Sequence, residues 1–253
     1  MLIRSVFVSL ALVGCSAAAP PAPVLAGSQW VIRTIDDRPL ESAPIDGVPR
    51  TPHLSFGARS YGGHAGCNAL GGLFVERGGR VYTYPGPQTA MGCGGRRADQ
   101  EAALDATLRA APSVSREGDA VVLAGGGHRL RLARAEQLGP VLDPPQAWQG
   151  TAVAGQRFEA RMIDGAWRTA GPQRMLRFTA STVTAVGFCP TAVTARYTQR
   201  EGSIAFAFAA TPCPQLAAFA GDRAAVSGPN GELLLGGNGH WLALDNLRRD
   251  RPK

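Results

Sequence analysis

The cysteines are the residues of this chain whose chemistry and spacing are most informative. There are five, at Cys15, Cys67, Cys93, Cys189 and Cys213. A cysteine thiol can be acylated, oxidised to a disulfide or bound to a metal ion. Because five is an odd number, at least one cysteine needs a role of its own. Cys15 lies near the N-terminus, whereas the other four form two pairs separated by 26 and 24 positions.

The first fifteen residues are typical of an export signal. Arg4 is followed by a short apolar run from Val6 to Val13 and then by Gly14-Cys15. This run is too short to cross a bilayer as a helix, so it predicts a cleaved signal peptide. Residues 12–15 resemble a bacterial lipobox, in which cleavage precedes the cysteine and the cysteine becomes acylated. We therefore predict lipidation of Cys15. The alternative is an ordinary signal peptide that is cleaved a few residues later.

In an oxidising envelope compartment the remaining cysteines are expected to form disulfides. Of the three connectivities, we favour the two local bridges, Cys67–Cys93 and Cys189–Cys213. The alternative is a metal site, since His64 lies three positions before Cys67. Such a site needs further ligands at clustered spacing, and the sequence shows none. We predict no metal and no cofactor.

An internal repeat accounts for the two cysteine pairs. A phenylalanine precedes the first cysteine of each pair by eleven positions, at Phe56 and Phe178. Residues 121–132 also align without gaps on residues 233–244, and both segments read as two strands around a glycine-rich turn. Shared anchors at fixed offsets indicate a tandem duplication.

The repeat divides the chain into six parts. They are a signal peptide (1–14), a tether rich in alanine and proline (15–26), a first module (27–134), a proline-containing linker (135–155), a degenerate second module (156–247) and a basic tail (248–253).

Short alternating segments predict that both modules are mainly β. The expected strands besides the two hairpins are residues 29–35, 53–56, 73–76, 80–84, 175–178, 182–186, 191–197 and 203–209. One helix is predicted at residues 99–111, because Leu104, Leu108 and Ala111 share a face and Pro112 ends the run. The corresponding stretch of the second module, residues 215–225, is shorter and is interrupted by Gly221.

The first module resembles the META-domain, or HslJ-like, family. The residues that carry the resemblance are Gly66, Cys67, Asn68, Thr89, Met91 and Cys93, followed by Asp99-Gln100-Glu101. The resemblance implies a bent antiparallel sheet or incomplete barrel with one helix in each module, an α+β variant of a mainly β fold. It also implies a bacterial envelope protein or lipoprotein with a link to stress or drug tolerance. The family supplies no agreed catalytic residues. In the second module Pro190 replaces the asparagine of the motif.

No catalytic motif accompanies these features. The chain has no Gly-x-Ser-x-Gly sequence. His128 and His240 occupy equivalent places beside the hairpin glycines and could act as paired ligands, one from each module. We favour the simpler interpretation, in which both are turn residues copied by the duplication. The chain is therefore not expected to be an enzyme.

The net charge of +7 comes almost wholly from arginine and is spread along the chain. Nucleic acid is not an expected partner, because basic and aromatic residues are not interleaved. We favour the interpretation that the basic residues form a solvated arginine-rich surface that reflects a GC-rich genome. The alternative is an anionic envelope polymer or a protein partner bound to this surface. The expected membrane contact is the lipid anchor. Ser16 follows the acylated cysteine, which by resemblance to enterobacterial sorting rules favours the outer membrane, facing the periplasm.

These observations favour an outer-membrane lipoprotein with a non-enzymatic binding or structural role. Two modules on one tether also suggest a shared interface or groove. A second hypothesis is a small-molecule or lipid carrier that uses the cavity of a barrel. A third is an envelope hydrolase, which would need a nucleophile and a base that the sequence does not show.

Overall fold

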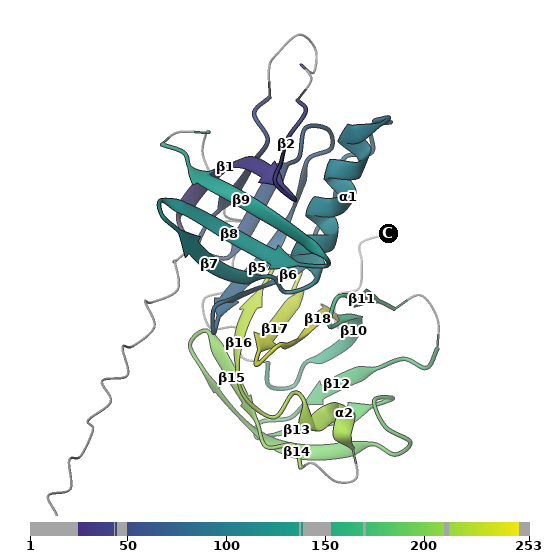
Figure 1. Ribbon diagram of the computed structural model, residues 1–253. Coiled ribbons are helices and arrows are strands. Elements are labelled where there is room, and N and C mark those ends of the chain that lie inside the picture. Colours follow the sequence, from purple (N-terminus) through teal and green to yellow (C-terminus); the bar gives the residue numbers. More distant parts are fainter. Residues whose placement is uncertain are drawn as a thin grey trace, which may run out of the picture.

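Antiparallel strands dominate the computed structural model, which describes residues 25–42, 44, 50–136, 138, 153–168, 171–209 and 213–247. The strands form two barrels that pack against each other, with a long helix beside the first (Figure 1). This confirms the predicted mainly β fold with two related modules. The signal peptide, Cys15, most of the linker and the basic tail lie outside the described residues.

The two barrels repeat the same order of elements. The N-terminal barrel contains β1 (Ser28–Ile35), β2 (Arg38–Pro39), β3 (His53–Phe56), β4 (Ser60–His64), β5 (Leu70–Arg77), β6 (Arg80–Pro85), α1 (Arg96–Arg109), β7 (Ser113–Glu117), β8 (Ala120–Gly125) and β9 (His128–Arg134). The C-terminal barrel contains β10 (Arg157–Ile163), β11 (Ala166–Trp167), β12 (Met175–Phe178), β13 (Thr182–Val186), β14 (Val193–Arg200), β15 (Ser203–Phe206), α2 (Pro214–Ala217), β16 (Gly221–Ser227), β17 (Leu233–Gly237) and β18 (His240–Asn246).

Each sheet closes into a complete barrel, whereas the sequence indicated only a bent sheet or an incomplete barrel. Strand β1 pairs with β9, and β10 pairs with β18, so eight strands of each module form a ring. Both closing pairs carry a register shift at the same relative place, between Ile32 and Thr34 and between Ala160 and Met162. A β-bulge increases local twist and bending, as closure requires. Closure also removes the exposed edges at which strands aggregate.

Side chains fill the interior of both barrels. In the N-terminal barrel, Trp30, Leu54 and Phe56 pack against Leu104 and Leu108 of α1 in one buried cluster. In the C-terminal barrel the cluster is rich in phenylalanine and includes Phe158, Phe178, Phe188, Phe206 and Phe219. Eight-stranded barrels have an interior just wide enough to be filled in this way. In the described residues, the interior of each barrel is thus occupied by a buried apolar cluster.

The helices differ between the modules. Helix α1 begins three residues before the predicted start, after Gly95, and ends at Arg109. In the second module only Pro214–Ala217 are helical, and the strand β16 follows at once, so most of the stretch matched to α1 is not helical. Next to this short helix lies the buried guanidinium of Arg223. It donates hydrogen bonds to the backbone carbonyls that follow α2, at residues 218, 219 and 220, and to that of Gly237 in β17.

The glycine-rich strand β4 was not predicted. Its sequence, Ser-Tyr-Gly-Gly-His, lacks the apolar alternation that marks a strand. A Cβ at Gly63 would lie 2.1 Å from the carbonyl oxygen of His53 on the paired strand β3, so the close approach of the two backbones requires glycine. Strand β7, strand β10 and the two short strands β2 and β11 were also not predicted from the sequence.

The barrels join through apolar side chains on their outer surfaces. Tyr82 and Tyr84 of β6 alternate with inward-facing residues and point away from the N-terminal core. They pack with Met162, Leu234 and Trp241 of the C-terminal barrel in a third buried cluster. The rings of Tyr82 and Trp241 have centroids 5.8 Å apart. The shared interface that we expected from two modules on one tether is thus confirmed.

A glycine allows the closest approach at this interface. A Cβ on Gly236 would lie 2.6 Å from the Cγ atom of Tyr82, well inside van der Waals contact. The Tyr82 ring therefore occupies the space that any other residue at position 236 would need. Gly239 in the adjacent turn donates its backbone N–H to the Tyr82 hydroxyl at 2.9 Å.

His64 is a buried polar residue of the N-terminal barrel, with 5% of its surface exposed. Its Nδ1 accepts a hydrogen bond from the backbone N–H of Gly66 at 3.1 Å, and its ring packs edge-on against His53. Burial, together with the nearby His53, lowers the pKa of His64 to about 4. The folded protein thus holds this imidazole neutral, whereas the unfolded chain protonates it near its ordinary pKa of 6.5.

We predict that His64 makes the protein less stable in mild acid. Between its unfolded and folded pKa values the unfolded chain binds more protons, so stability falls as the pH falls from about 6.5 towards 4. Lowering the pH from 7.5 to 5 should cost about 2 kcal/mol through this group. Urea unfolding of the wild type and His64→Gln at both pH values measures it, since the stability gap between them should shrink by that amount. An unchanged gap would contradict the assignment.

Candidate functional site

The structure places both predicted cysteine pairs at disulfide distance. The Cα atoms are 6.3 Å apart for Cys67 and Cys93, and 6.0 Å apart for Cys189 and Cys213. Both separations lie within the range of protein disulfides. In each barrel the pair connects the segment after the third strand of the ring, β4 or β13, to the segment that precedes the helix or lies next to it.

Asn68, the central residue of the sequence motif, bonds to the long loop that contains Thr89 and Met91. Its side-chain oxygen accepts from the backbone N–H of Met91 at 2.6 Å and from the Thr89 hydroxyl at 3.1 Å. Its amide nitrogen donates to the Met91 carbonyl at 3.1 Å and to Glu101 at 3.0 Å. These contacts use the donors and acceptors of the amide for structure. The motif residues therefore tie the loop to β5 and α1.

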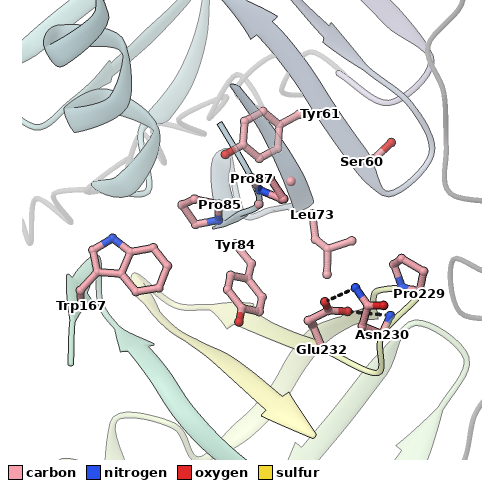
Figure 2. A pocket seen from close by; sticks show the side chains of 12 residues that line it. Ser60, Tyr61, Leu73, Tyr84, Pro85, Pro87, Trp167, Pro229, Asn230 and Glu232 are labelled. Atoms are coloured by element: carbon pink, nitrogen blue, oxygen red, sulfur yellow. Dashed lines mark hydrogen bonds between the residues drawn. The ribbon is translucent and has the colours of Figure 1, made fainter. Parts of the chain in front are cut away.

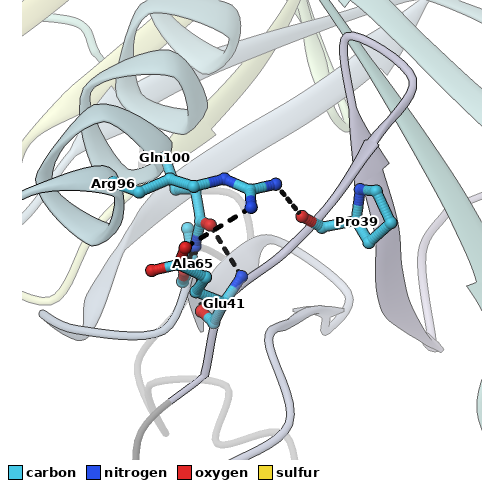
Figure 3. Close-up of polar contacts among 5 residues, drawn as sticks. All are labelled: Pro39, Glu41, Ala65, Arg96 and Gln100. Atoms are coloured by element: carbon cyan, nitrogen blue, oxygen red, sulfur yellow. Dashed lines mark hydrogen bonds and ion pairs between the residues drawn. The ribbon is translucent and has the colours of Figure 1, made fainter.

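Gln100 plays the same part on the other side of α1 (Figure 3). Its amide donates to the carbonyls of Ala65 and Glu41 at 2.8 and 3.0 Å and accepts from the Glu41 N–H at 2.7 Å. Arg96 adds an ion pair to Glu41 at 3.4 Å and a hydrogen bond to the Pro39 carbonyl. The start of α1 is thus connected to the segment after β2 and to the turn after β4.

The alternative metal site at Cys67 is not supported by the arrangement of its side chains. Among the described residues, the potential ligand atoms of Cys67, Cys93 and Glu101 lie within 4.8 Å of one another. The two sulfur atoms face each other as a disulfide pair, which removes both thiolates as ligands. Glu101 accepts from Asn68, and His64 is bonded to Gly66.

His128 and His240 do not meet as paired ligands. His128 Nδ1 bonds to Asp36 at 2.8 Å, and His240 Nδ1 bonds to Asp164 at 2.9 Å, each within its own barrel. The other oxygen of each aspartate accepts a backbone N–H from the residue after the histidine, at 2.9 and 2.7 Å. The bond from His128 holds the pKa of Asp36 below its ordinary value. This aspartate–histidine clamp, present once in each barrel, agrees with the interpretation of both histidines as turn residues.

A pocket of about 460 Å³ lies where the two barrels meet (Figure 2). Strands β4, β5 and β6 form one wall, and β11 with the loop between β16 and β17 forms the other. Its lining includes Tyr61, Leu73, Tyr84, Pro85, Trp167 and Glu232. Trp167 is 42% exposed, although large apolar side chains are otherwise mostly buried in the described chain.

Contacts between the barrels hold the aromatic walls of the pocket in place. The Tyr84 hydroxyl donates to Asp245, which also accepts from Arg161 at 2.6 Å. The guanidinium of Arg109 lies 5.6 Å from the centre of the Trp167 ring. Burial raises the pKa of Tyr84, and the bond to Asp245 raises it further. The phenol is therefore a neutral hydrogen-bond donor at physiological pH.

A second hollow of about 470 Å³ lies between β5 and the C-terminal barrel. Backbone and small side chains form much of its wall, together with Arg59, Glu76 and Arg77. Phe74, its aromatic lining residue, belongs to the buried core of the N-terminal barrel. We therefore take the aromatic pocket as the candidate site.

None of the residues of this pocket was singled out from the sequence. One signal was available: Tyr82 and Tyr84 stand two positions apart on a strand whose alternate residues, Val81 and Thr83, face inward. An aromatic pair on the outer face of a strand indicates a partner surface. Trp167 and Glu232 come from loops or a very short strand, where the sequence has no periodicity to interpret.

Comparison with known proteins agrees with the resemblance of the first module. Residues 23–137 match the family model of the META domain. No curated protein matches the chain. One similar solved structure, determined by NMR, is 19% identical and has a TM-score of 0.39, with 46% of this chain and 95% of that chain covered. An NMR structure of a protein from Burkholderia xenovorans is 18% identical, with a TM-score of 0.36 and coverages of 51% and 100%. By the family-model match, residues 23–137 of this chain are similar to the META domain.

Proposed function

We propose that this protein is a membrane-anchored envelope protein that binds a small apolar ligand between its two barrels and does not transform it. The observation that carries the proposal is the aromatic pocket that both barrels build, with Trp167 exposed at its rim. Its volume of about 460 Å³ falls in the range of small-molecule sites. The META domain is not a known enzyme family.

The chemistry of the lining supports binding without catalysis. Acid–base or nucleophilic catalysis needs a reactive group within hydrogen-bond reach of a base. The described residues that line the pocket include no histidine, cysteine or lysine, and their only carboxylate, that of Glu232, accepts hydrogen bonds from Asn230. Burial raises the pKa of both Tyr61 and Tyr84, which disfavours their reactive phenolate forms. The proline and leucine side chains offer an apolar surface for a ligand.

The envelope location of this proposal rests on sequence features. The leader and Cys15 lie outside the described residues. No helix among the described residues has the length and apolar character needed to span a membrane. Two cysteine pairs at disulfide distance suit an oxidising compartment. A lipid on Cys15 would hold the barrels at the periplasmic face of the outer membrane, where uptake of apolar compounds would serve stress or drug tolerance.

Replacing Cys15 tests the anchor. We expect Cys15→Ser to abolish incorporation of labelled palmitate and to move the protein from the membrane to the soluble fraction of the envelope, because the acyl chains supply the membrane affinity. Cys67→Ser serves as the control, since it removes a cysteine that is not acylated. Palmitate labelling of Cys15→Ser at the wild-type level would contradict lipidation at this residue.

Replacing Trp167 tests the pocket. We expect the uncharged dye N-phenylnaphthylamine to bind the wild type with enhanced fluorescence, and Trp167→Ala to weaken its affinity about tenfold through the loss of a large aromatic contact. Leu247 is equally exposed, at 41%, and does not line the pocket, so Leu247→Ala is the matched control. Equal dissociation constants for the two variants, or no binding to the wild type, would refute the proposed site.

A further inference from the structure

The pocket carries a negative charge in a protein whose net charge is +7. Among the described residues that line it, Glu232 alone is charged at neutral pH. The other described lining residues are uncharged: aromatic, aliphatic and proline side chains, glycines, and the polar side chains of Ser60 and Asn230. A single carboxylate in an otherwise uncharged wall determines the charge of the ligand that the wall attracts.

The turn between β16 and β17 holds the Glu232 carboxylate in position. Asn230 donates its backbone N–H to one carboxylate oxygen at 3.0 Å and its side-chain amide to the other at 2.9 Å. The same turn is closed by a bond from the N–H of Gly228 to the carbonyl of Glu232 at 2.9 Å. A Cβ at Gly228 would lie 2.6 Å from Glu232 Oε2, so this glycine leaves room for the carboxylate. Each oxygen retains acceptor capacity for a ligand.

The other charges near the pocket already have partners. Asp245 pairs with Arg161 at 2.6 Å, and Asp105 pairs with Arg109 at 2.8 Å. Within the described ranges no arginine or histidine forms an ion pair with Glu232, whose hydrogen bonds come from the neutral Asn230. Within the described part of the chain, no positive charge is therefore paired with this carboxylate.

Aromatic rings extend the region that attracts positive charge. Figure 2 shows the ring of Tyr84 between Trp167 and Glu232 along one side of the pocket. The face of an aromatic ring carries partial negative charge and attracts cations, most strongly when water is excluded. Arg109 lies over the Trp167 ring, so the carboxylate of Glu232 with the ring of Tyr84 beside it is the better contact for a ligand cation.

We propose that the pocket selects a monovalent organic cation with an apolar body, such as a hydrophobic quaternary ammonium or protonated amine. The cationic head lies against Glu232 and the face of Tyr84, and the apolar body covers Leu73, Pro85 and Trp167. Anionic compounds are rejected by the carboxylate. This inference rests on the proposed function and specifies the ligand class of the same pocket.

Calorimetric titration of the full mature chain with three aromatic probes tests the selectivity. The probes are benzyltrimethylammonium, uncharged benzyl alcohol and anionic benzenesulfonate. We expect the cation to bind about tenfold more tightly than the alcohol, and benzenesulfonate to bind more weakly than either. Glu232→Gln should remove most of the preference for the cation and leave only the smaller share that the face of Tyr84 supplies. Glu201→Gln, which removes an exposed acid that does not line the pocket, should keep the preference for the cation.

The outcomes separate this inference from the proposed function. Retained binding of N-phenylnaphthylamine by Glu232→Gln shows that the variant keeps an intact pocket. If the wild type binds the alcohol as tightly as the cation, or if Glu232→Gln keeps the wild-type preference for the cation, the selectivity is refuted while the pocket stands. If neither the dye nor any of the three probes binds the wild type, the proposed function and the inference both fail.

Discussion

The arrangement of this molecule depends on the burial of apolar side chains that two closed barrels carry on their outer faces. A closed barrel satisfies its backbone hydrogen bonds and fills its own interior, so only its outer face remains to contact a neighbouring barrel. Here β6 presents Tyr82 and Tyr84 outward, and β17 presents Leu234 outward between inward-facing leucines. Packing these faces removes them from water and sets the position of one barrel against the other. The candidate pocket exists only because of this contact, since each barrel contributes one wall.

The two copies share the features that close each barrel and differ in the loops and helices outside the ring of strands. Both copies retain the bulge in the closing strand pair, the aspartate–histidine clamp and a cysteine pair at disulfide distance. The network around Asn68 belongs to the first module, where it ties a long loop to α1. The second copy has Pro190 at the corresponding position and uses buried Arg223 to satisfy carbonyls near its short helix. In the second barrel, where the helix is short, one long side chain with several donors thus bonds to the nearby carbonyls.

Local and repeated features were predictable from the sequence, and contacts between the copies were not. The hairpins, the long helix and the cysteine pairing follow from periodicity, turn glycines and the internal repeat, which act over short distances or recur. Strand β4 escaped prediction because its glycines serve the close approach of β3, as the contact at Gly63 shows. Strand β16 was matched to a helix because nothing near Gly221 in the sequence shows that Arg223 will be buried. The pocket joins Tyr84 to Trp167 and Glu232, which are far apart in the sequence, so only the docking of two finished barrels brings them together.

The central claim is that the two barrels form one cooperative unit through the cluster around Tyr82, Gly236 and Trp241. Differential scanning calorimetry of the mature chain tests it most directly. If the interface couples the barrels, they will unfold in one transition whose calorimetric enthalpy equals its van't Hoff enthalpy. Two separate transitions, neither of which shifts when Gly236→Ala forces a methyl group against Tyr82, would show that the barrels fold independently and would contradict the account.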